Sequence, residues 1–572
     1  MMIEVLLKRV SVFMLPLVTV FFIYSSTAAH SSEFAAIAMP DAYSAATARK
    51  IIESGGNAVD ASIAAAFVLA VTLPEAGNIG GGGFMTAHID GEPSFLDFRE
   101  VAPASATTGM FLDADGKPID PYELMFGPIA VGVPGTVRGL EMAHKAYGTM
   151  SWKSLLESAI TLARDGFVVD PNLAHNWEKW KKPVSNGTNF LDHFENLKSG
   201  EVFKQPELAR TLSRLAEDPD DFYLGETAGM LVATMEKFGG RIVAQDLKNY
   251  EAHWRDPLEA DWRDYTIITA PPPSSGGIAL IQMLKMRDET AKSFEGIEHN
   301  SSKYIHLLAE IEKLAFADRA AHLGDPGFVT VPVEKLLDDA YLKERALLVD
   351  PSKISSGGSV VSGFESPDTT HFSIIDFDGN AVALTYTLHA VFGSGLVVEE
   401  AGFLLNNELA DFSPKDDVPN AHGVLGKSSN SIEPNKRSLS SMTPTIMLSE
   451  GRPFVVIGTP GGTTIFNSVF QVLLNLFDFQ MDAQDAVSAT RFHHQLPEAT
   501  LIHYDENRVP LPELKEGLAR YGYELVPNWW GDLGDVQLIF KESASRLTAA
   551  SDPRGRGTAE VIPFTEVAEA SR

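Results

Sequence analysis

Apolar residues recur every three or four positions through much of the first two thirds of the chain, which predicts amphipathic helices. A strand near Ala36 is followed by two helices, over 45–53 and 58–70, that Gly55-Gly56-Asn57 separates. The second is apolar on nearly every face, which predicts a buried helix. The same spacing predicts further helices over 136–147, 152–165, 207–216, from about 278, and over 304–322.

The pattern changes to strands after residue 368. Segments 371–377 and 381–388 flank an Asp378-Gly379-Asn380 turn, which predicts a β-hairpin. Thr385 and Thr387 share a face of the return strand, so we expect a hydroxyl from there to face Thr369. A helix over 481–491 and a strand pair around 536–541 are predicted to complete this part of the chain.

Short polar breaks interrupt the apolar pattern. Segments 439–443 and 459–463 lie at predicted strand ends, where a rigid strand can hold catalytic groups. The glycine run within 78–85 lacks the Gly-Lys-Ser/Thr of a phosphate loop, so it is interpreted as a corner where backbone approaches backbone. Segment 352–368 is rich in Ser and Gly, which is typical of a surface segment where a backbone cut is easily accommodated.

Composition restricts the classes of function. The chain has 572 residues, 44 % of them hydrophobic and 21 % charged, which is typical of a folded protein of about two to four domains. A formal net charge of -30 argues against binding nucleic acid or an anionic membrane surface, and requires a locally basic pocket for any anionic substrate. There is no cysteine, so disulfides, thiolate metal sites and a cysteine nucleophile are excluded. No HExxH-like spacing indicates a metal.

The first 29 residues have the pattern of a signal peptide. Lys8 and Arg9 precede an apolar stretch over 10–24, and small residues follow up to Ala28 and Ala29, after either of which cleavage is expected. An uncleaved anchor helix is the alternative. Export is favoured because the apolar stretch is interrupted by proline and is short of the roughly 20 residues that span a bilayer.

Arg99 lies in segment 95–100, which is predicted to be a strand. An arginine between apolar neighbours needs a partner, because burying its charge alone is costly. The residues alone favour a structural salt bridge over a substrate carboxylate.

Several short segments, taken in their order and spacing, resemble the γ-glutamyltransferases (γ-glutamyltranspeptidases), a family of N-terminal-nucleophile hydrolases. The resemblance extends from about residue 36 almost to the C-terminus. It is carried by segments 57–61, 79–84, 271–277, 369–371, 376–387, 404–407, 434–437, 439–445 and 460–462.

The resemblance implies an α+β fold, a four-layer αββα sandwich formed by two chains cut from one precursor. The cut is expected between Asp368 and Thr369, giving a large subunit over 30–368 and a small subunit over 369–572, of 572 - 368 = 204 residues. The two would remain together as a heterodimer in the periplasm, or be secreted.

The resemblance also implies catalytic roles. Thr369 would be the nucleophile, with its freed α-amine as the base. The Thr387 hydroxyl would bond the nucleophile, and the N–H groups of Gly461 and Gly462 would form the oxyanion hole.

The remaining implied roles concern the zwitterionic γ-glutamyl group. Arg99, with Ser440 and Ser441, would hold the α-carboxylate, which replaces the structural interpretation of Arg99. Asp411, with Glu408 beside it, would hold the α-ammonium.

Two residues depart from the family pattern. His389 stands where the family usually has asparagine, and we expect it to alter affinity and pH response in the substrate pocket. His422 replaces a tyrosine in a segment that matches the lid of bacterial members, which predicts looser closure and a larger share of hydrolysis.

The implied reaction is cleavage of γ-glutamyl amide bonds, with glutathione as the usual donor. Water, an amino acid or a dipeptide would accept the acyl group, and no cofactor or metal is expected. Alternatives on the same fold are a glutaryl-cephalosporin-type acylase and a poly-γ-glutamate transpeptidase. A binding protein without catalysis is a further alternative, against which the retained site residues argue.

Overall fold

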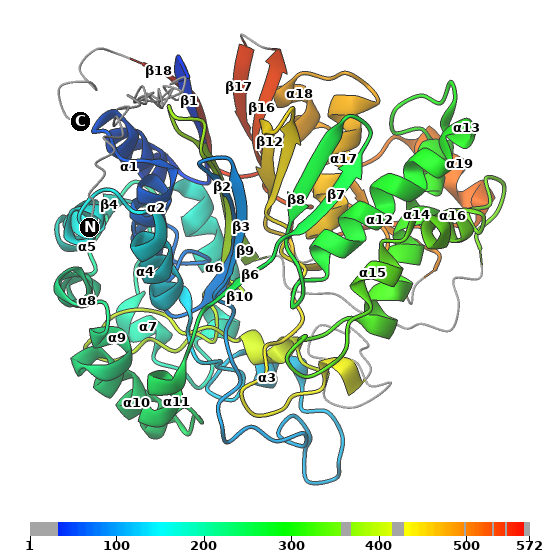
Figure 1. Ribbon diagram of the computed structural model, residues 1–572. Helices are drawn as coiled ribbons and strands as arrows, with labels where there is room; N and C mark the ends of the chain where they lie inside the picture. The colour runs from blue at the N-terminus through cyan, green and yellow to red at the C-terminus, as the bar shows by residue number, and fades with distance from the viewer. Residues whose placement is uncertain are drawn as a thin grey trace, which may run out of the picture.

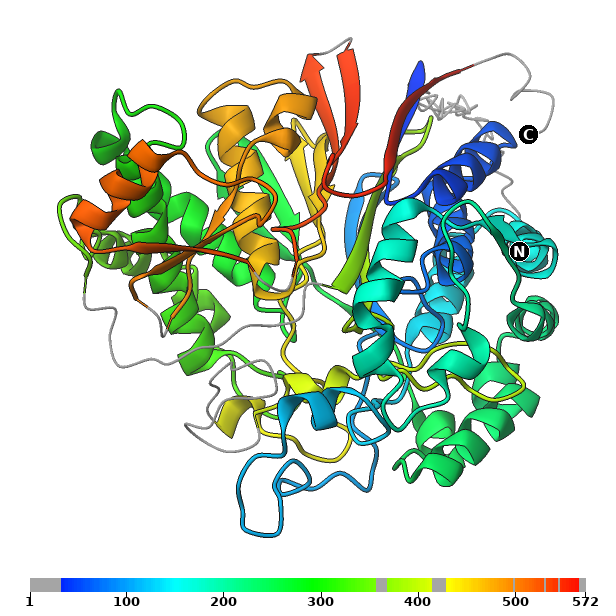
Figure 2. The same ribbon diagram turned by 180° about the vertical axis from the view of Figure 1, so that it is seen from behind.

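Two sheets lie face to face, and helices cover the outer side of each (Figures 1 and 2). The computed structural model describes residues 32–355, 368–413, 428–496, 499–528, 531–543 and 546–564. Within these, the first sheet has the order β18-β1-β9-β10-β2-β3-β6 and the second β17-β16-β12-β11-β8-β7, with antiparallel neighbours throughout. The architecture is the four-layer αββα sandwich expected for N-terminal-nucleophile hydrolases.

The strands of the two sheets come from distant parts of the chain. Those of the first sheet are β1 (Phe34–Met39), β2 (Gly82–Ile89), β3 (Glu92–Asp97), β6 (His253–Arg255), β9 (Asp368–Ile375), β10 (Ala381–His389) and β18 (Thr558–Pro563). Those of the second are β7 (Leu258–Trp262), β8 (Tyr265–Thr269), β11 (Thr445–Ser449), β12 (Arg452–Gly458), β16 (Gln537–Ser543) and β17 (Arg546–Ser551). Two small sheets contain β4 (Phe167–Val168) with β5 (Val202–Phe203), and β13 (Phe492–His493), β14 (Leu501–Tyr504) and β15 (Glu524–Pro527).

The helices divide between the two outer layers. The longer ones on the side of the first sheet are α1 (Ala42–Glu53), α2 (Ala58–Thr72), α4 (Thr136–Tyr147), α5 (Trp152–Asp165), α6 (Pro171–Val184), α8 (Pro206–Glu217) and α10 (Glu226–Phe238). On the side of the second sheet lie α12 (Gly276–Glu289), α14 (Ser302–His322), α16 (Asp339–Ala346), α17 (Ile465–Phe477), α18 (Ala483–Ser488) and α19 (Pro512–Tyr521). Short helices are α3 (Pro121–Met125), α7 (Phe190–His193), α9 (Asp221–Leu224), α11 (Ala244–Asn249), α13 (Ala291–Phe294), α15 (Val333–Leu336), η1 (Glu408–Asp411), η2 (Ser428–Asn430) and η3 (Gly462–Thr464).

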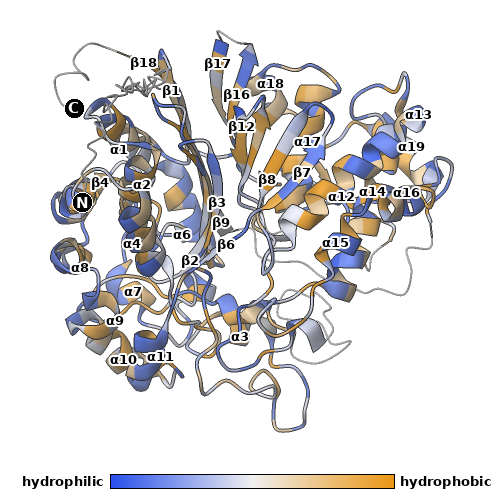
Figure 3. Ribbon diagram, viewed as in Figure 1, coloured by the Kyte–Doolittle hydropathy of each residue, from blue (hydrophilic) through white to orange (hydrophobic). Residues whose placement is uncertain are grey.

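Burial of apolar side chains holds the layers together. Every residue of α2 is buried, as its uniform apolarity predicts. Figure 3 shows hydrophobic colours on interior elements such as α17, while the outer α11 is largely hydrophilic. Small and β-branched side chains fill the space between the two sheets, which lets them approach closely: Ala36, Ala38, Ile268, Ile375, Ala381, Ala383, Ile446, Val456 and Ile539. No helix among the described residues is both long and apolar enough to pass through a bilayer.

Most predicted elements are confirmed, including the hairpin of β9 and β10 and the helices over 136–147 and 152–165. Two predictions were wrong in their bounds. The strand expected to carry Arg99 ends at Asp97, so Arg99 lies in the loop after β3. The helix expected over 481–491 is only α18, which ends where its Asp485 carbonyl accepts the amide of Ala489.

The glycine run forms the corner that the sequence predicts. A Cβ added at Gly80 would lie 2.1 Å from the carbonyl oxygen of Leu404, and one at Gly81 would lie 2.0 Å from that of Thr387. The amide of Gly81 instead donates to Oδ1 of Asn78 at 2.8 Å. Only glycine lets β2 begin this close to the end of β10, the strand that carries Thr387.

Candidate active site

The hairpin places two threonine hydroxyls opposite each other. Thr369 on β9 is the register partner of Thr387 on β10, and its Oγ1 donates to Oγ1 of Thr387 at 3.2 Å. The pairing shifts between Thr387 and His389, and His389 has a φ of 81°. This irregularity turns the backbone so that the His389 amide donates to the same Thr387 oxygen at 2.7 Å. Thr387 therefore accepts two hydrogen bonds at the start of β9.

His371 supports the hairpin from below. Its Nδ1 lies 2.7 Å from Oγ1 of Thr385 and its Nε2 lies 3.1 Å from Oγ of Ser373. Burial lowers the pKa of His371 to about 3, so the ring is neutral at neutral pH. Thr385 is thus engaged by His371, and of the two threonines on that face Thr387 is the one that bonds Thr369.

Arg99 reaches the site from the loop after β3. The Asp97 carboxylate accepts the Arg99 amide at 3.0 Å, which fixes the start of this loop. The guanidinium contacts Glu408 and Asp411 on η1, with Nη1 2.6 Å from Oε1 of Glu408 and Nη2 2.8 Å from Oδ2 of Asp411. All three side chains are at most 4 % exposed. Arg99 thus has structural ion pairs and also forms part of the cavity wall.

Carboxyl groups outnumber cations around Arg99. Burial raises the pKa of Glu100 to about 7, and raises that of Glu408 well above its ordinary range, although Arg99 opposes both shifts. Asp411 is shared, since its other oxygen lies 2.8 Å from Nε2 of His389. Ligand atoms of His389, Glu408 and Asp411 lie within 4.8 Å of one another, but the Arg99 guanidinium already contacts two of these groups. The Arg99 cation therefore already offsets part of the negative charge of these three possible metal ligands.

Ser440 and Ser441 lie in the polar break before β11. The Ser440 amide donates to the carbonyl of Pro273 at 2.9 Å, and the Ser275 amide donates back to the Ser440 carbonyl at 2.7 Å. The Ser441 hydroxyl accepts from Arg319 at 3.4 Å. The proline-rich turn before α12 thereby fixes the backbone of both serines.

Gly461 and Gly462 follow β12 and precede α17. Both have positive φ, 137° and 56°, and a Cβ on Gly461 would lie 2.4 Å from Oγ1 of Thr464. The Gly461 carbonyl accepts from the amide of Thr464 at 3.0 Å. Within the described part of the chain, neither glycine amide donates a backbone hydrogen bond. The turn thus presents two N–H groups at the start of a helix, a geometry suited to an anionic oxygen.

The structure brings nearly all the predicted site residues into one small cavity. Two predicted residues do not line this cavity themselves. Gly461 precedes the lining residue Gly462 in the chain, and Asp368 is the first residue of β9, where it pairs with His389. The predicted residues that line the cavity are Arg99, Thr369, Thr387, His389, Glu408, Asp411, Ser440, Ser441 and Gly462.

Sequence reasoning missed four contributors. Met442 and Ile465 line the apolar side of the cavity; Met442 lies within the polar break over 439–443, and Ile465 follows the one over 459–463. The Ser438 hydroxyl accepts from Arg99 at 3.2 Å, and Glu100 lies buried next to Arg99 in the chain. The only signal in the sequence for the last two was nearness to a predicted site residue, since Glu100 follows Arg99 and Ser438 lies two positions before Ser440. The predicted signal peptide, the segment over 356–367 and His422 lie outside the described residues.

Comparison with known proteins shows which family the chain resembles over most of its length. A family profile described as Gamma-glutamyltranspeptidase matches residues 44–562. The "Glutathione hydrolase proenzyme" of Pseudomonas aeruginosa is 52 % identical over 544 residues, covering 94 % of this chain and 97 % of the relative.

Two solved structures are also similar. A "Gamma-glutamyltranspeptidase from Pseudomonas nitroreducens complexed with L-DON" is 52 % identical, with a TM-score of 0.55 over 56 % of this chain and 96 % of that one. A cephalosporin acylase from Bacillus halodurans is 25 % identical, with a TM-score of 0.79 over 92 % of this chain and 96 % of that one. The extent and level of these matches show that the chain belongs to the gamma-glutamyltranspeptidase family.

Proposed function

We propose that the protein is a self-processing γ-glutamyltransferase that cleaves γ-glutamyl amides such as glutathione and passes the acyl group to water or to an amine. One observation carries this proposal. A threonine hydroxyl, a buried arginine and two buried carboxyl groups line the same cavity. A γ-glutamyl group needs these elements, because its α-carbon bears both an anion and a cation some distance from the reacting carbonyl.

Cleavage between Asp368 and Thr369 makes Thr369 the first residue of the small subunit, over 369–572. Its free α-amine has a reference pKa of about 7.7 to 8.0, so a useful fraction is neutral near pH 7. The neutral amine takes the proton of Oγ1 as the oxygen attacks the γ-carbonyl. The hydrogen bond to Thr387 orients this oxygen. The proposal therefore needs no separate histidine base, and His371 is too deeply buried to serve as one.

The pocket residues then divide by charge. Arg99, with Ser440 and Ser441, holds the α-carboxylate, and Asp411 with Glu408 holds the α-ammonium. In the structure the Arg99 guanidinium contacts both the Glu408 and the Asp411 carboxyl groups. An incoming zwitterion replaces those pairs with equivalent ones, so a buried charge is never left alone. Gly461 and Gly462 donate to the oxyanion of the tetrahedral intermediate.

We expect cleavage of γ-glutamyl-p-nitroanilide to exceed that of glutaryl-p-nitroanilide by about 10- to 100-fold in kcat/KM. Glutaryl lacks the α-ammonium, so it leaves the buried Asp411 carboxylate without its substrate partner, a loss of about 1.5 to 3 kcal/mol for a charged hydrogen bond. Steady-state release of p-nitroaniline measures both reactions. A preference for glutaryl would instead identify an acylase, as in the Bacillus halodurans structure, which is the more distant relative at 25 % identity.

His389 gives a second test. His389→Gly removes the ring that contacts Asp411 but keeps the positive φ and the amide that bonds Thr387. We expect the KM for the γ-glutamyl donor to rise about tenfold, or about 1.4 kcal/mol, with a smaller change in kcat. His389→Asn, which also tolerates positive φ, should restore most of the affinity. Equal losses in both variants would show that the ring has no part in holding Asp411.

The remaining features of the proposal concern maturation. The signal peptide over 1–29 directs export to the periplasm, or secretion, and the large subunit over 30–368 stays bound to the small one. Seven residues of β10 pair with β2 of the large subunit, and β9 pairs with β1 of the large subunit. These ladders support a heterodimer that survives the cut.

A further inference from the structure

Arg319 lies behind two serines of the small cavity beside Thr369. It belongs to α14 and is 6 % exposed, and the described residues that line the cavity do not include it. We propose that Arg319 is a positioning residue that makes Ser441 a hydrogen-bond donor, so that the pocket selects a substrate with a carboxylate rather than a carboxamide on its α-carbon. The inference rests on the proposed function, because it concerns the same γ-glutamyl pocket.

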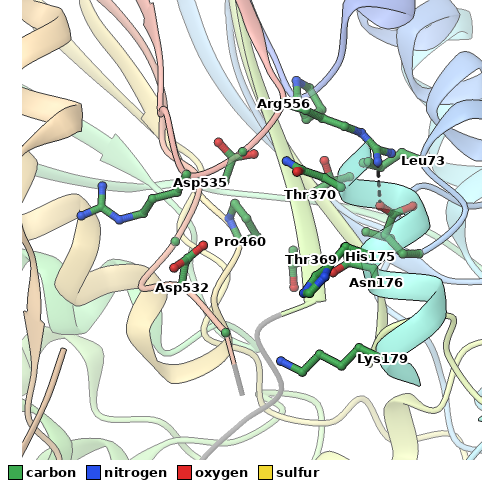
Figure 4. A pocket seen from close by; sticks show the side chains of 18 of the residues that line it. Leu73, His175, Asn176, Lys179, Thr369, Thr370, Pro460, Asp532, Asp535 and Arg556 are labelled. Carbon is green, nitrogen blue, oxygen red and sulfur yellow. Dashed lines mark ion pairs between the residues drawn. The ribbon is translucent and has the colours of Figure 1, made fainter. Parts of the chain in front are cut away.

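The two serines belong to one of the two spaces that Thr369 borders. The other is a wider cleft of about 370 Å³, which Figure 4 shows between α6 and the segment around Asp532. Among the described residues, Ser440 and Ser441 line the small cavity and not this cleft. A residue that acts through them should therefore affect recognition of the γ-glutamyl group.

The Arg319 guanidinium reaches both serine positions at once. Its Nη2 donates to Oγ of Ser441 at 3.4 Å, and its Nε donates to Oγ of Ser275 at 3.0 Å. The Ser275 hydroxyl in turn donates to the carbonyl of Ser440 at 2.8 Å. A guanidinium holds its N–H groups in a rigid planar fork. One side chain therefore fixes Ser441 directly and Ser440 through Ser275.

These contacts decide what the serine hydroxyls can do. A hydroxyl has one proton to donate and two lone pairs, whereas an arginine N–H can only donate. Ser441 is therefore the acceptor in its bond with Arg319, and its own proton is available to another partner. Ser440 has the same arrangement, since its Oγ accepts the amide of Met442 at 3.1 Å. Because both serines line the cavity, both hydroxyls can donate to a group bound there.

A carboxylate is the ligand group that two such donors match. It only accepts hydrogen bonds, whereas a carboxamide would also bring N–H donors to the same place. Arg99 is not enough by itself, because its N–H groups already contact Glu408 and Asp411. The second guanidinium, buried behind the serines, favours an anion further because water screens its charge little.

The test compares two donors in the mature enzyme, γ-glutamyl-p-nitroanilide and the same anilide with its α-carboxylate converted to a carboxamide. Steady-state release of p-nitroaniline gives kcat/KM for each. We expect the wild type to prefer the carboxylate donor, and Arg319→Met to lower that preference about tenfold, mainly through a higher KM for the carboxylate donor. Arg319→Lys keeps a cation but loses the fork, so it should recover only part of the preference.

A double-mutant cycle shows whether Arg319 acts through Ser441. Ser441→Ala should also lower the preference, and adding Arg319→Met to it should lower it little further. Arg345→Met is the matched control, because Arg345 also contacts α14, with Nη2 2.8 Å from the Leu314 carbonyl and 2.9 Å from Asp318. It should leave the preference at its wild-type value.

The outcomes separate this inference from the proposed function. A wild-type preference in Arg319→Met, or losses that simply add in the double variant, would overturn the inference. An equal loss in Arg345→Met would do the same, since general damage to α14 would then explain the effect. If intact mass shows that Arg319→Met is not processed, Arg319→Lys carries the test, and a wild-type preference there overturns the inference. If the wild type cleaves neither donor, the proposed function fails instead.

Discussion

The Thr369→Ala precursor will remain a single chain and will lose its γ-glutamyl hydrolase activity by about 10⁴-fold or more, the scale on which removal of a nucleophile acts. Both effects have one cause in the proposed mechanism, in which the same hydroxyl attacks the preceding carbonyl of Asp368 during processing and the γ-carbonyl of the substrate afterwards. Intact mass spectrometry of the purified protein measures the first effect, and p-nitroaniline release measures the second. The wild type should give a small subunit of 204 residues beginning at Thr369, from 572 - 368 = 204.

Thr369→Ser is the matched control. It keeps a hydroxyl at the position where Oγ1 contacts Thr387, so it should still be cut, more slowly than the wild type, and retain part of the activity. If the alanine variant is also cut at Asp368, another protease makes the cut and the zymogen mechanism is wrong. If it is uncut but keeps its turnover, the nucleophile lies elsewhere.

Local sequence patterns predicted the hairpin and its opposed threonines well. Strand residues alternate between faces, and the Asp-Gly turn fixes the register, so Thr387 had to lie near Thr369 once both strands formed. The helices with clear three- and four-residue spacing were equally accessible, as α4 and α5 show. In these elements the residues that decide the structure are close together in the chain.

The electrostatic part of the site could not be predicted in the same way. Arg99 and Asp411 are 312 residues apart, and the ion pair between them depends on how the first sheet packs against η1. The shift in register at His389 is likewise invisible to a two-residue period, yet it brings the His389 ring to Asp411. The resemblance named His389 and Asp411 but gave no sign that these two residues contact each other.

Arg99→Met should lower the free energy of unfolding and donor cleavage together. It removes the cation between Glu408 and Asp411, and breaking a buried ion pair costs about 3 to 5 kcal/mol. It also removes the group proposed to hold the substrate carboxylate, so kcat/KM for γ-glutamyl-p-nitroanilide should fall by about 10² to 10³-fold, since charged hydrogen bonds contribute about 1.5 to 3 kcal/mol each. Thermal unfolding and steady-state kinetics measure the two effects.

A distant ion pair separates these two effects. Arg287 contacts Asp478 at 2.8 Å, and the two side chains are 11 % and 10 % exposed, on α12 and at the end of α17. Arg287→Met should therefore destabilise the fold, although Arg263 still contacts Asp478 at 2.8 Å, and leave the donor KM near its wild-type value. Arg99→Lys keeps the charge but loses the planar fork, so it should be more stable than Arg99→Met and still bind the donor poorly. If Arg99→Met and Arg287→Met had the same kinetics at equal loss of stability, Arg99 would be a structural cation only. A selective loss in Arg99→Met and Arg99→Lys would place the substrate carboxylate at the guanidinium.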